Sequence, residues 1–368
     1  MQEIPFLDLT YQTKIVQKDI NSRWDKLISD SNFILGEELN KFEIEYSNYC
    51  NIKHSIGVGN GGDAIELLIR SLNLDKKTRI FIPSNTFFAT ASAISRAGYE
   101  IIFVDVDLET GHINLEKLLN HKFKKTDCIL PVHLFGSMVD IKTIRSSLMS
   151  SIKIIEDSAQ AHGATFKNDS PGKHSLGATY SFYPGKNLGA FGDAGMITTN
   201  SKRIAERIKK LRNYGSIKKY HHELIGYNSR LDPIQAVVLS EKLKYLDAWN
   251  QQRRNNFLLY VKHLETLSEV KLLNNGDTSG SVFHLTVARV KKRNELIQYL
   301  SKNKISTIIH YPIPLHKTKA FSYYSTKKNE LKNSEILGRE IISLPNFPGM
   351  SENQINYVCE KLKDFYKY

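Results

Sequence analysis

Between about residues 56 and 200, short apolar runs alternate with stretches of helical periodicity, and this alternation limits the possible folds more than any other feature. Such alternation is typical of a largely parallel sheet with helices on both faces. The last two expected strands are joined by a turn too short to carry a helical crossover. We therefore expect an α/β fold with a mixed, mostly parallel sheet between helices. The expected strands are residues 55–58, 80–83, 101–104, 128–132, 153–155, 179–182 and 195–199, and the first expected helices are 63–72 and 89–97.

The chain after residue 200 has a different pattern, which indicates a second, smaller domain. A helical pattern over residues 233–267 is long enough to connect two domains. Strand and helix patterns over 282–290, 294–302 and 352–366 then indicate an α+β unit. The first 50 residues, rich in polar helix formers, are expected to form an arm on the large domain. The expected division is residues 1–240 for the arm and large domain, and residues 241–368 for the linking helix and small C-terminal domain.

Charge and cysteine content limit the partners and the compartment. The formal net charge is +13, but the lysines are scattered and no RRM, zinc-finger or helix-turn-helix signature accompanies them, which argues against nucleic acid. Two explanations of this charge are equally good. The surface is simply rich in lysine, or it attracts an anionic small molecule. The three cysteines are isolated, and no apolar run approaches the roughly 20 residues that span a bilayer. We expect a cytoplasmic protein with no metal site and no membrane or nucleic-acid partner.

Lys186 stands in a turn between the last two expected strands, directly after Pro184 and Gly185. Asp157 ends an earlier strand that is otherwise apolar, so its carboxylate needs a partner if it is buried. Pyridoxal 5′-phosphate (PLP) requires this pair: a lysine binds its aldehyde covalently, and an aspartate keeps its pyridine nitrogen protonated. The alternative is an exposed loop lysine, which the apolar, glycine-rich residues 188–192 disfavour. The pair predicts a PLP site with Lys186 as the catalytic residue, its pKa lowered by burial near a cationic ring.

A glycine-rich turn over residues 59–64 joins the first expected strand to its helix and contains Gly61, Gly62 and Asp63. Glycines let a ligand approach the backbone, and a helix N-terminus offers free N–H groups and a positive dipole end, so the turn suits a phosphate. The alternative is a plain tight turn in which Asp63 caps the helix. Ser181, on the strand that enters the lysine turn, is expected to direct its hydroxyl toward the same phosphate.

Three further residues follow the ends of expected strands. Phe87 follows strand 80–83 and either lies over the cofactor ring or belongs to the core. Gln160, three residues after Asp157, is expected to reach the phenolic oxygen of the cofactor. His162 either orients Asp157 or satisfies hydrogen bonds in the core.

Beyond these residues, ordered blocks over nearly the whole chain resemble the DegT/DnrJ/StrS family of PLP-dependent sugar aminotransferases. The resemblance implies fold type I, the aspartate aminotransferase fold, with a large PLP-binding domain and a small C-terminal domain. The blocks are residues 4–9, 33–36, 57–63, 132–136, 156–163, 181–195, 213–215, 226–232 and 310–312.

The same resemblance implies a homodimer with active sites at the subunit interface. The loop bearing Asn228 and Arg230 would reach the partner chain's site, where Asn228 touches the cofactor phosphate and Arg230 the substrate. Many family members have Thr where this chain has Gly62, which removes one hydroxyl contact to the phosphate. The family's dehydrating variants replace the catalytic lysine, so the presence of Lys186 disfavours them. The resemblance also assigns Lys219 to the nucleotide diphosphate, and to the sugar it assigns Tyr183, His310 and Tyr311.

Residues 219–223 are similar to the branch of the family that aminates the 3-keto carbon of dTDP-linked 6-deoxyhexoses. The implied reaction moves an amino group from L-glutamate to C-3 of a dTDP-3-keto-6-deoxyhexose, giving a dTDP-3-amino-3,6-dideoxyhexose. One alternative is amination at C-4 of a dTDP- or UDP-4-keto-6-deoxyhexose. Another, from a different class, is a non-catalytic PLP-binding regulatory protein. O-antigen, S-layer glycan and antibiotic-sugar synthesis all stay open as destinations of the product.

Overall fold

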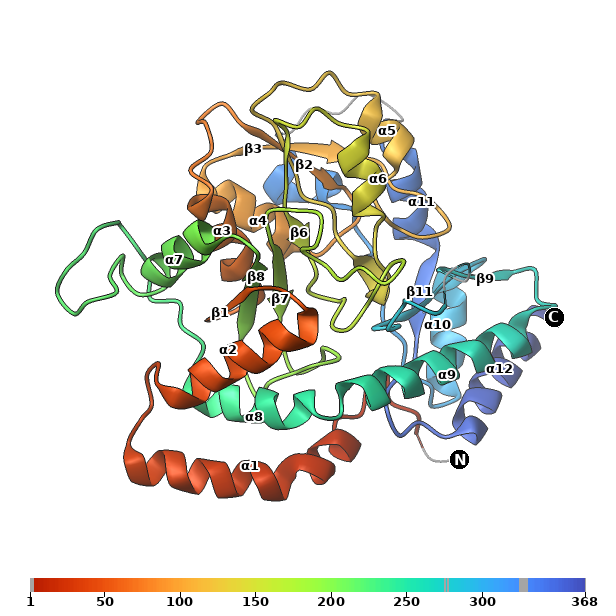
Figure 1. Cartoon of the computed structure of the whole chain (residues 1–368). Coiled ribbons are helices and arrows are strands. Elements are labelled where there is room, and N and C mark those ends of the chain that lie inside the picture. Colours follow the sequence, from red (N-terminus) through yellow and green to blue (C-terminus); the bar gives the residue numbers. More distant parts are fainter. Residues whose placement is uncertain (1–2, 275, 277, 324–329, 368) are drawn as a thin grey trace.

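The mixed sheet that the sequence predicts lies at the centre of the chain (Figure 1). The structure is a computed structural model that describes residues 3–274, 276, 278–323 and 330–367. The strands of the sheet are β1 (His54–Val58), β2 (Arg79–Pro83), β3 (Glu100–Val104), β4 (Cys128–Ile129), β5 (Lys153–Ile154), β6 (Glu156–Asp157), β7 (Ala178–Ser181) and β8 (Gly195–Thr199).

Two groups of strands, in the orders β3-β2-β4-β5 and β1-β8-β7-β6, make up this sheet. They join at Ile155, where the backbone N–H groups of Ile155 and Asp157 bond to the carbonyls of Ile129 and Pro131 and continue the parallel pairing. β8 is antiparallel to both β1 and β7, while β6 and β7 are parallel. The carboxyl ends of β2, β6 and β7 therefore lie at one edge, where ligands collect in open α/β sheets.

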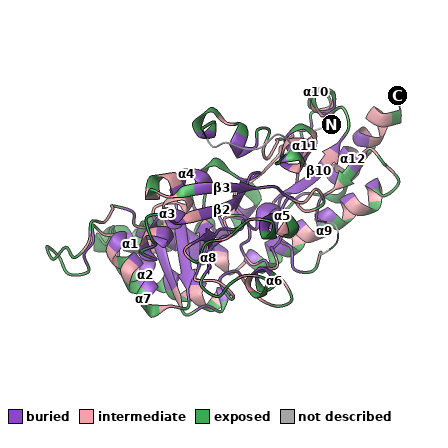
Figure 2. Cartoon of the chain, turned by 90° about the horizontal axis from the view of Figure 1, so that it is seen from above, coloured by how far each residue is buried: buried purple, intermediate pink, exposed green. Residues whose placement is uncertain are grey.

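Each face of the sheet is covered by its own helices, and Figure 2 shows that the strands between them are buried. Met196 and Ile197 are neighbours in β8 but pack into different clusters, as the two-residue period of a strand requires. Each such fully buried side chain stabilises the fold by about 1.5–3 kcal/mol. The Ile197 face is covered by α3 (Gly61–Ser71), α4 (Phe88–Ala97) and α7 (Lys202–Leu211), and the Met196 face by α2 (Glu37–Cys50) and α8 (Pro233–Leu243).

Two predicted elements are wrong in extent. The expected strand 128–132 is reduced to β4, because Pro131 has no N–H to donate and the chain beyond it pairs only through the bridge between Val132 and Asp157. The expected helix 233–267 is two helices, α8 and α9 (Leu246–Leu264), with a break next to Tyr245. α8 packs on α2 and on α1 (Thr10–Asp30), whereas α9 packs on α12 (Glu352–Lys367). The break lets the two helices face different cores.

The C-terminal region has its own three-stranded antiparallel sheet, in the order β11-β10-β9. Ile4 at the other end of the chain packs into its core and pairs with Ile305. The N-terminal arm therefore reaches the small domain as well as α8, and the division at residue 240 stays a proposal. No helix in the described ranges is long and apolar enough to cross a bilayer. The remaining elements are α5 (Leu115–Leu119), η1 (Leu134–Gly136), α6 (Ile141–Ser146), β9 (Val270–Leu272), β10 (Thr286–Val290), α10 (Arg293–Lys302), η2 (Leu315–Lys317), η3 (Lys319–Phe321), α11 (Lys332–Glu340) and β11 (Ile341–Leu344).

Candidate active site

Lys186 is held in a tight turn between β7 and β8. Its backbone N–H bonds to the carbonyl oxygen of Tyr183 at 2.8 Å. A side chain on Gly189 would collide with the carbonyl of Pro184, so the turn requires glycine there. Burial lowers the pKa of Lys186 to about 8, against the opposing charge of Asp157. An amine with this pKa can act as nucleophile and proton carrier near neutral pH.

Asp157 ends β6 with its carboxylate buried close to the lysine turn. One carboxylate oxygen accepts a hydrogen bond from the Thr90 hydroxyl at 2.8 Å, and the other accepts one from the backbone N–H of Ala159 at 3.1 Å. Burial raises the pKa of Asp157, while these two hydrogen bonds and the charge of Lys186 oppose the rise. A cation placed against this carboxylate would stabilise its charged form.

The first turn of α3 lies directly beside Ser181. A Cβ atom on Gly61 would come within 2.6 Å of the Ser181 Cβ, so this close approach needs glycine. The Asn60 side chain caps the helix by accepting the N–H of Asp63 at 2.8 Å, and the alternative in which Asp63 is the cap is wrong. The N–H groups of a helix's first turn have no partner within the helix, and among them that of Gly61 lies next to the Ser181 side chain. This arrangement suits a phosphate.

Gln160 connects the large domain to a residue from beyond position 300. Its amide Nε2 donates to the Tyr311 hydroxyl at 3.2 Å, and its Oε1 accepts the backbone N–H of Phe135 at 2.7 Å. The Phe87 ring is 56% exposed and lies 5.7 Å from the Tyr311 ring, centroid to centroid. Phe87 is therefore at the surface of the site rather than in the core, and an aromatic ligand ring can pack against it.

His162 and His310 have separate places around the lysine turn. His162 bonds to the Tyr46 hydroxyl at 3.0 Å and to the Ser181 carbonyl at 2.8 Å. It makes no bond to Asp157, so of its two predicted roles the structure favours the core one. Burial and the nearby charge of Lys186 lower the pKa of His310 to about 4, so its ring is neutral at physiological pH.

The remaining predicted residues do not converge on Lys186 within this chain. Tyr183 is 61% exposed in the lysine turn. The segment between α7 and α8 contains Lys219, Asn228 and Arg230, and its middle part projects from the body of the molecule in Figure 1. Asn228 lies at its base, where it pairs with Asn213 and its neighbour Ser229 bonds to Gly59 and Asp63. Arg230 bonds to Asn213 at the base of this segment, at 2.9 Å.

Sequence reasoning missed three residues next to the site: Thr90, Asn187 and His284. Thr90 lies on α4 and bonds to Asp157 only because that helix packs beside β6. Asn187 is adjacent to Lys186 and bonds to His284 at 3.0 Å. Adjacency to the lysine was the only signal for Asn187, and no local pattern marks the other two.

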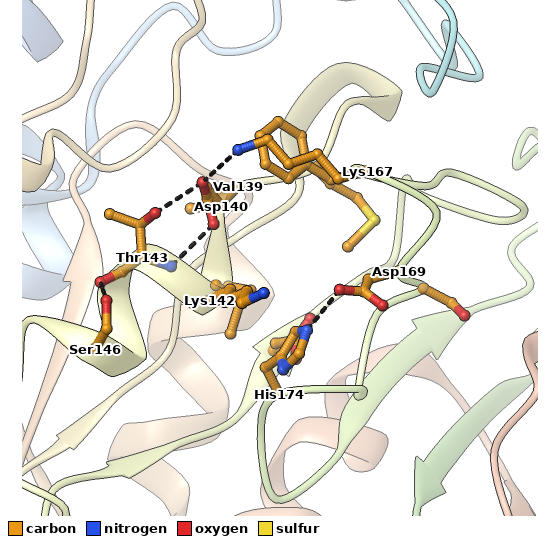
Figure 3. Close-up of a pocket in the computed structure, with 13 residues that line it drawn as sticks. Val139, Asp140, Lys142, Thr143, Ser146, Lys167, Asp169 and His174 are labelled. Carbon is orange, nitrogen blue, oxygen red and sulfur yellow. Dashed lines mark hydrogen bonds and ion pairs between the residues drawn. The ribbon is translucent and has the colours of Figure 1, made fainter.

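A separate hollow lies on the opposite side of β6, between α6 and the loop that follows Phe166 (Figure 3). Its volume is about 340 Å³. Asp140 caps α6 through Thr143, and His174 bonds to Asp169 at 2.6 Å. Glu156 lines it, whereas its neighbour Asp157 faces the lysine turn. None of the predicted site residues lines this hollow, which is therefore not the centre of the chemistry.

The residues around Lys186 fit PLP. A buried carboxylate is available for the ring nitrogen, an amine for the aldehyde, exposed Phe87 for the ring face, and N–H groups beside a serine for the phosphate. Fold and side chains together define a PLP-dependent transferase of fold type I.

The chain belongs to the DegT/DnrJ/EryC1/StrS aminotransferase family, whose model matches residues 14–363. It is 41% identical to dTDP-3-amino-3,6-dideoxy-alpha-D-galactopyranose transaminase from Aneurinibacillus thermoaerophilus, covering 98% of this chain and 99% of the relative. It is 39% identical to the pleiotropic regulatory protein of Geobacillus stearothermophilus, covering 99% of each. The crystal structure of DesV from S. venezuelae superposes with a TM-score of 0.96 at 33% identity, covering 100% of both chains. The chain is thus a PLP-dependent sugar-nucleotide aminotransferase.

Proposed function

We propose that the enzyme moves the amino group of L-glutamate to C-3 of a dTDP-3-keto-6-deoxyhexose and yields a dTDP-3-amino-3,6-dideoxyhexose. The observation that carries the chemistry is the pairing of half-buried Lys186, with a pKa lowered to about 8, and buried Asp157. The C-3 position and the dTDP group are supported by the transaminase from Aneurinibacillus thermoaerophilus. Bound PLP supplies an electron sink for the charge that develops at the carbon losing its proton.

Each residue of this chain then has a defined task. The amine of Lys186 would hold the cofactor between turnovers and, once displaced by the amino donor, accept the proton from the donor's α-carbon at Nζ and return it to the cofactor. Asp157, held by Thr90, would keep the ring nitrogen protonated. Phosphate would lie on the first turn of α3 beside Ser181, with Gly61, Gly62 and Asp63 in that turn.

The substrate side of the proposal involves both domains. Tyr311, bonded to Gln160, and neutral His310 would contact the sugar together with Tyr183. Tyr311 and His310 come from a segment far along the chain from the lysine turn, so the sugar would lie between two parts of the molecule, as small-molecule sites commonly do.

A homodimer with shared sites is part of the same proposal. Lys219 lies on a projecting segment with exposed apolar side chains, including Tyr220 and Ile225, and Asn228 and Arg230 lie at the base of this segment. Such a surface favours a protein contact. In a twofold dimer the segment would bring Asn228 to the cofactor phosphate of the partner's site, Lys219 to the nucleotide diphosphate and Arg230 to the substrate.

Amination at C-4 of a dTDP- or UDP-4-keto-6-deoxyhexose is the second candidate. A relative named UDP-N-acetyl-3-dehydro-alpha-D-glucosamine 3-aminotranferase, 33% identical, supports a UDP-linked sugar as an alternative to dTDP, although its own name places the amination at C-3. The non-catalytic alternative is set aside, since the family and the named transaminases establish an enzyme. The three free, buried cysteines support placement of the reaction in the cytoplasm.

The test follows the visible absorbance of the cofactor-loaded protein. L-Glutamate should convert the lysine-bound form to the amine form, and the 3-keto sugar nucleotide should restore it. The position of the new amino group is then read by NMR of the product. Restoration by the 4-keto sugar alone would replace the C-3 proposal with the second candidate, and no response to glutamate would contradict the proposed donor.

A further inference from the structure

Asn187, the residue after Lys186, is the centre of a buried hydrogen-bond network. Its Nδ2 donates to Oδ1 of Asn250 on α9 at 2.8 Å and to the carbonyl oxygen of Val282 at 3.0 Å. Both partners in these two bonds act as acceptors, so the orientation of the Asn187 amide is fixed. Its Oδ1 therefore lies toward His284, whose Nδ1 is 3.0 Å away.

This orientation determines the tautomer of His284. An amide oxygen can only accept a hydrogen bond, so Nδ1 of His284 carries the proton and donates it to Asn187. In a neutral imidazole the other nitrogen then carries a lone pair. Nε2 of His284 has no hydrogen-bond partner within the described part of the chain, and the side chain is half-buried.

The electrostatics keep His284 neutral. Burial lowers its pKa well below the ordinary value, and the positive charges of Lys186 and Arg253 act in the same direction. The bond to Asn187, the residue after Lys186, places the ring next to the lysine turn. His284 therefore presents an acceptor, not a cation, near Lys186 across the pH range in which the enzyme works.

We propose that His284 is a substrate-binding residue whose Nε2 accepts a hydrogen bond from a sugar hydroxyl on a carbon next to the one that is aminated. Several other groups there are donors, such as the Lys186 amine and the Gln160 amide, which donates to Tyr311. A hexose hydroxyl both donates and accepts hydrogen bonds. A site in which most groups are donors therefore also needs an acceptor if it is to recognise the hydroxyl. Asn187 is the positioning residue that holds the ring in this tautomer. The inference rests on the proposed function and specifies one contact within it.

The experiment is a binding measurement, because it has a readout other than turnover. Enzyme loaded with the amine form of the cofactor is titrated by calorimetry with the dTDP-3-amino-3,6-dideoxyhexose and with its 2-deoxy and 4-deoxy analogues. His284→Asn keeps an N–H donor for Asn187 and removes Nε2. We expect this variant to bind the sugar that carries both hydroxyls about tenfold more weakly, because one buried hydrogen bond contributes about that much to the affinity. The loss should vanish with the analogue that lacks the bonded hydroxyl.

Conservative replacement and controls separate this role from a structural one. His284→Gln places an amide oxygen near the position of Nε2 and should recover part of the affinity. If His284→Asn does not fold, His284→Phe replaces it, because phenylalanine keeps a planar ring but has no nitrogen to accept the hydrogen bond. His174→Asn removes a histidine that bonds to Asp169 in the separate hollow and should leave the affinity unchanged.

The outcomes distinguish the two proposals. Equal affinity in wild type and His284→Asn, or a loss that persists with both deoxy analogues, overturns the inference alone. No binding of the amino sugar nucleotide to wild type overturns the proposed function and the inference with it.

Discussion

The Lys186 turn and the segment between α7 and α8 differ in how far each is held by the rest of the chain. The turn is bonded on several sides, and its neighbour Asn187 is almost fully buried. The segment projects into solvent, with Tyr220 81% and Ile225 94% exposed. The first region places the proposed proton carrier among residues of its own chain. The second contacts its own chain mainly at its base, where Ser229 bonds to Gly59 and Asp63, while its tip is exposed. The difference supports the proposal of shared sites, in which the exposed tip of the segment would complete the site of a second subunit.

The largest effect on activity is expected in the Lys186 turn. Lys186→Ala should lower the rate of the glutamate half-reaction by at least about a thousandfold, because no other amine replaces it as proton carrier. Stopped-flow absorbance measures this rate. Lys242 is a control with the same lowered pKa of about 8: it is buried, but it donates to the Gly189 carbonyl at 2.7 Å. Lys242→Met should lower the unfolding temperature and retain the response to glutamate. Full activity of Lys186→Ala would falsify the assignment.

Asp157→Asn should lower kcat by about a hundredfold or more, since a neutral amide cannot stabilise a protonated ring nitrogen. The amide can still accept the hydrogen bond from Thr90, so the fold should be retained. Thr90→Val, which only removes that bond, should cost less, about tenfold. If kcat of Thr90→Val fell as far as that of Asp157→Asn, Thr90 would do more than hold the Asp157 carboxylate, which would contradict the proposal.

The lowered pKa of Lys186 makes a prediction about stability without cofactor. Its folded pKa is about 8, against 10.5 for the free side chain. The unfolded chain therefore binds more protons between these values, and the lysine's contribution to the free energy of unfolding rises with pH over that window. Below pH 8 the buried lysine is destabilising, so Lys186→Met should stabilise the apoprotein by about 2 kcal/mol. The difference should shrink toward pH 10.5. Denaturant unfolding at several pH values measures it, and a constant difference would contradict the lowered pKa.

The projecting segment is tested by mixing variants. If sites are shared, Asn228→Ala should impair the partner's site, while Lys186→Ala inactivates its own. Equal amounts of the two variants, exchanged as subunits, should regain about a quarter of wild-type activity, because half of the dimers contain one intact site.

A matched mixture of Lys186→Ala with Asp157→Asn should regain no activity, because both residues act in the site of their own chain and every site then carries a defect. Two different affinity tags on the variants verify that subunits have exchanged. No recovery in the first mixture, with exchange verified, would place Asn228 in the site of its own chain.

The smallest effect is expected in the phosphate cradle. Gly62→Thr would add a hydroxyl beside the N–H groups of α3 and should tighten PLP binding a few-fold, as one extra hydrogen bond contributes. The new Cβ would lie 3.3 Å from Oδ1 of Asn60, a tight fit that limits the gain. Fluorescence titration of the apoprotein measures the affinity. Weaker binding would show that strain at the Asn60 cap outweighs the added contact.

Much of the fold follows from local pattern. The strands and the first helices are found near the predicted residues because apolar periodicity reports which side chains face a core. The break at Tyr245 was not predictable, since no proline or glycine marks it and it arises where α8 and α9 pack on different partners. Likewise β4 ends early because the chain beyond Pro131 finds little pairing in the sheet, and the apolar composition of the segment does not reveal this.

The sequence by itself determined the proposed catalytic pair and the proposed phosphate turn, because Lys186, Asp157 and Gly61 each occur in a local setting that only a few functions require. Tertiary structure alone decided which side chains surround them. Thr90, Gln160 with Tyr311, and the Asn187–His284 pair meet across helices and domains. The physical reason is that a hydrogen bond depends on ångström-scale distances between segments far apart in the chain, and no local pattern encodes those distances.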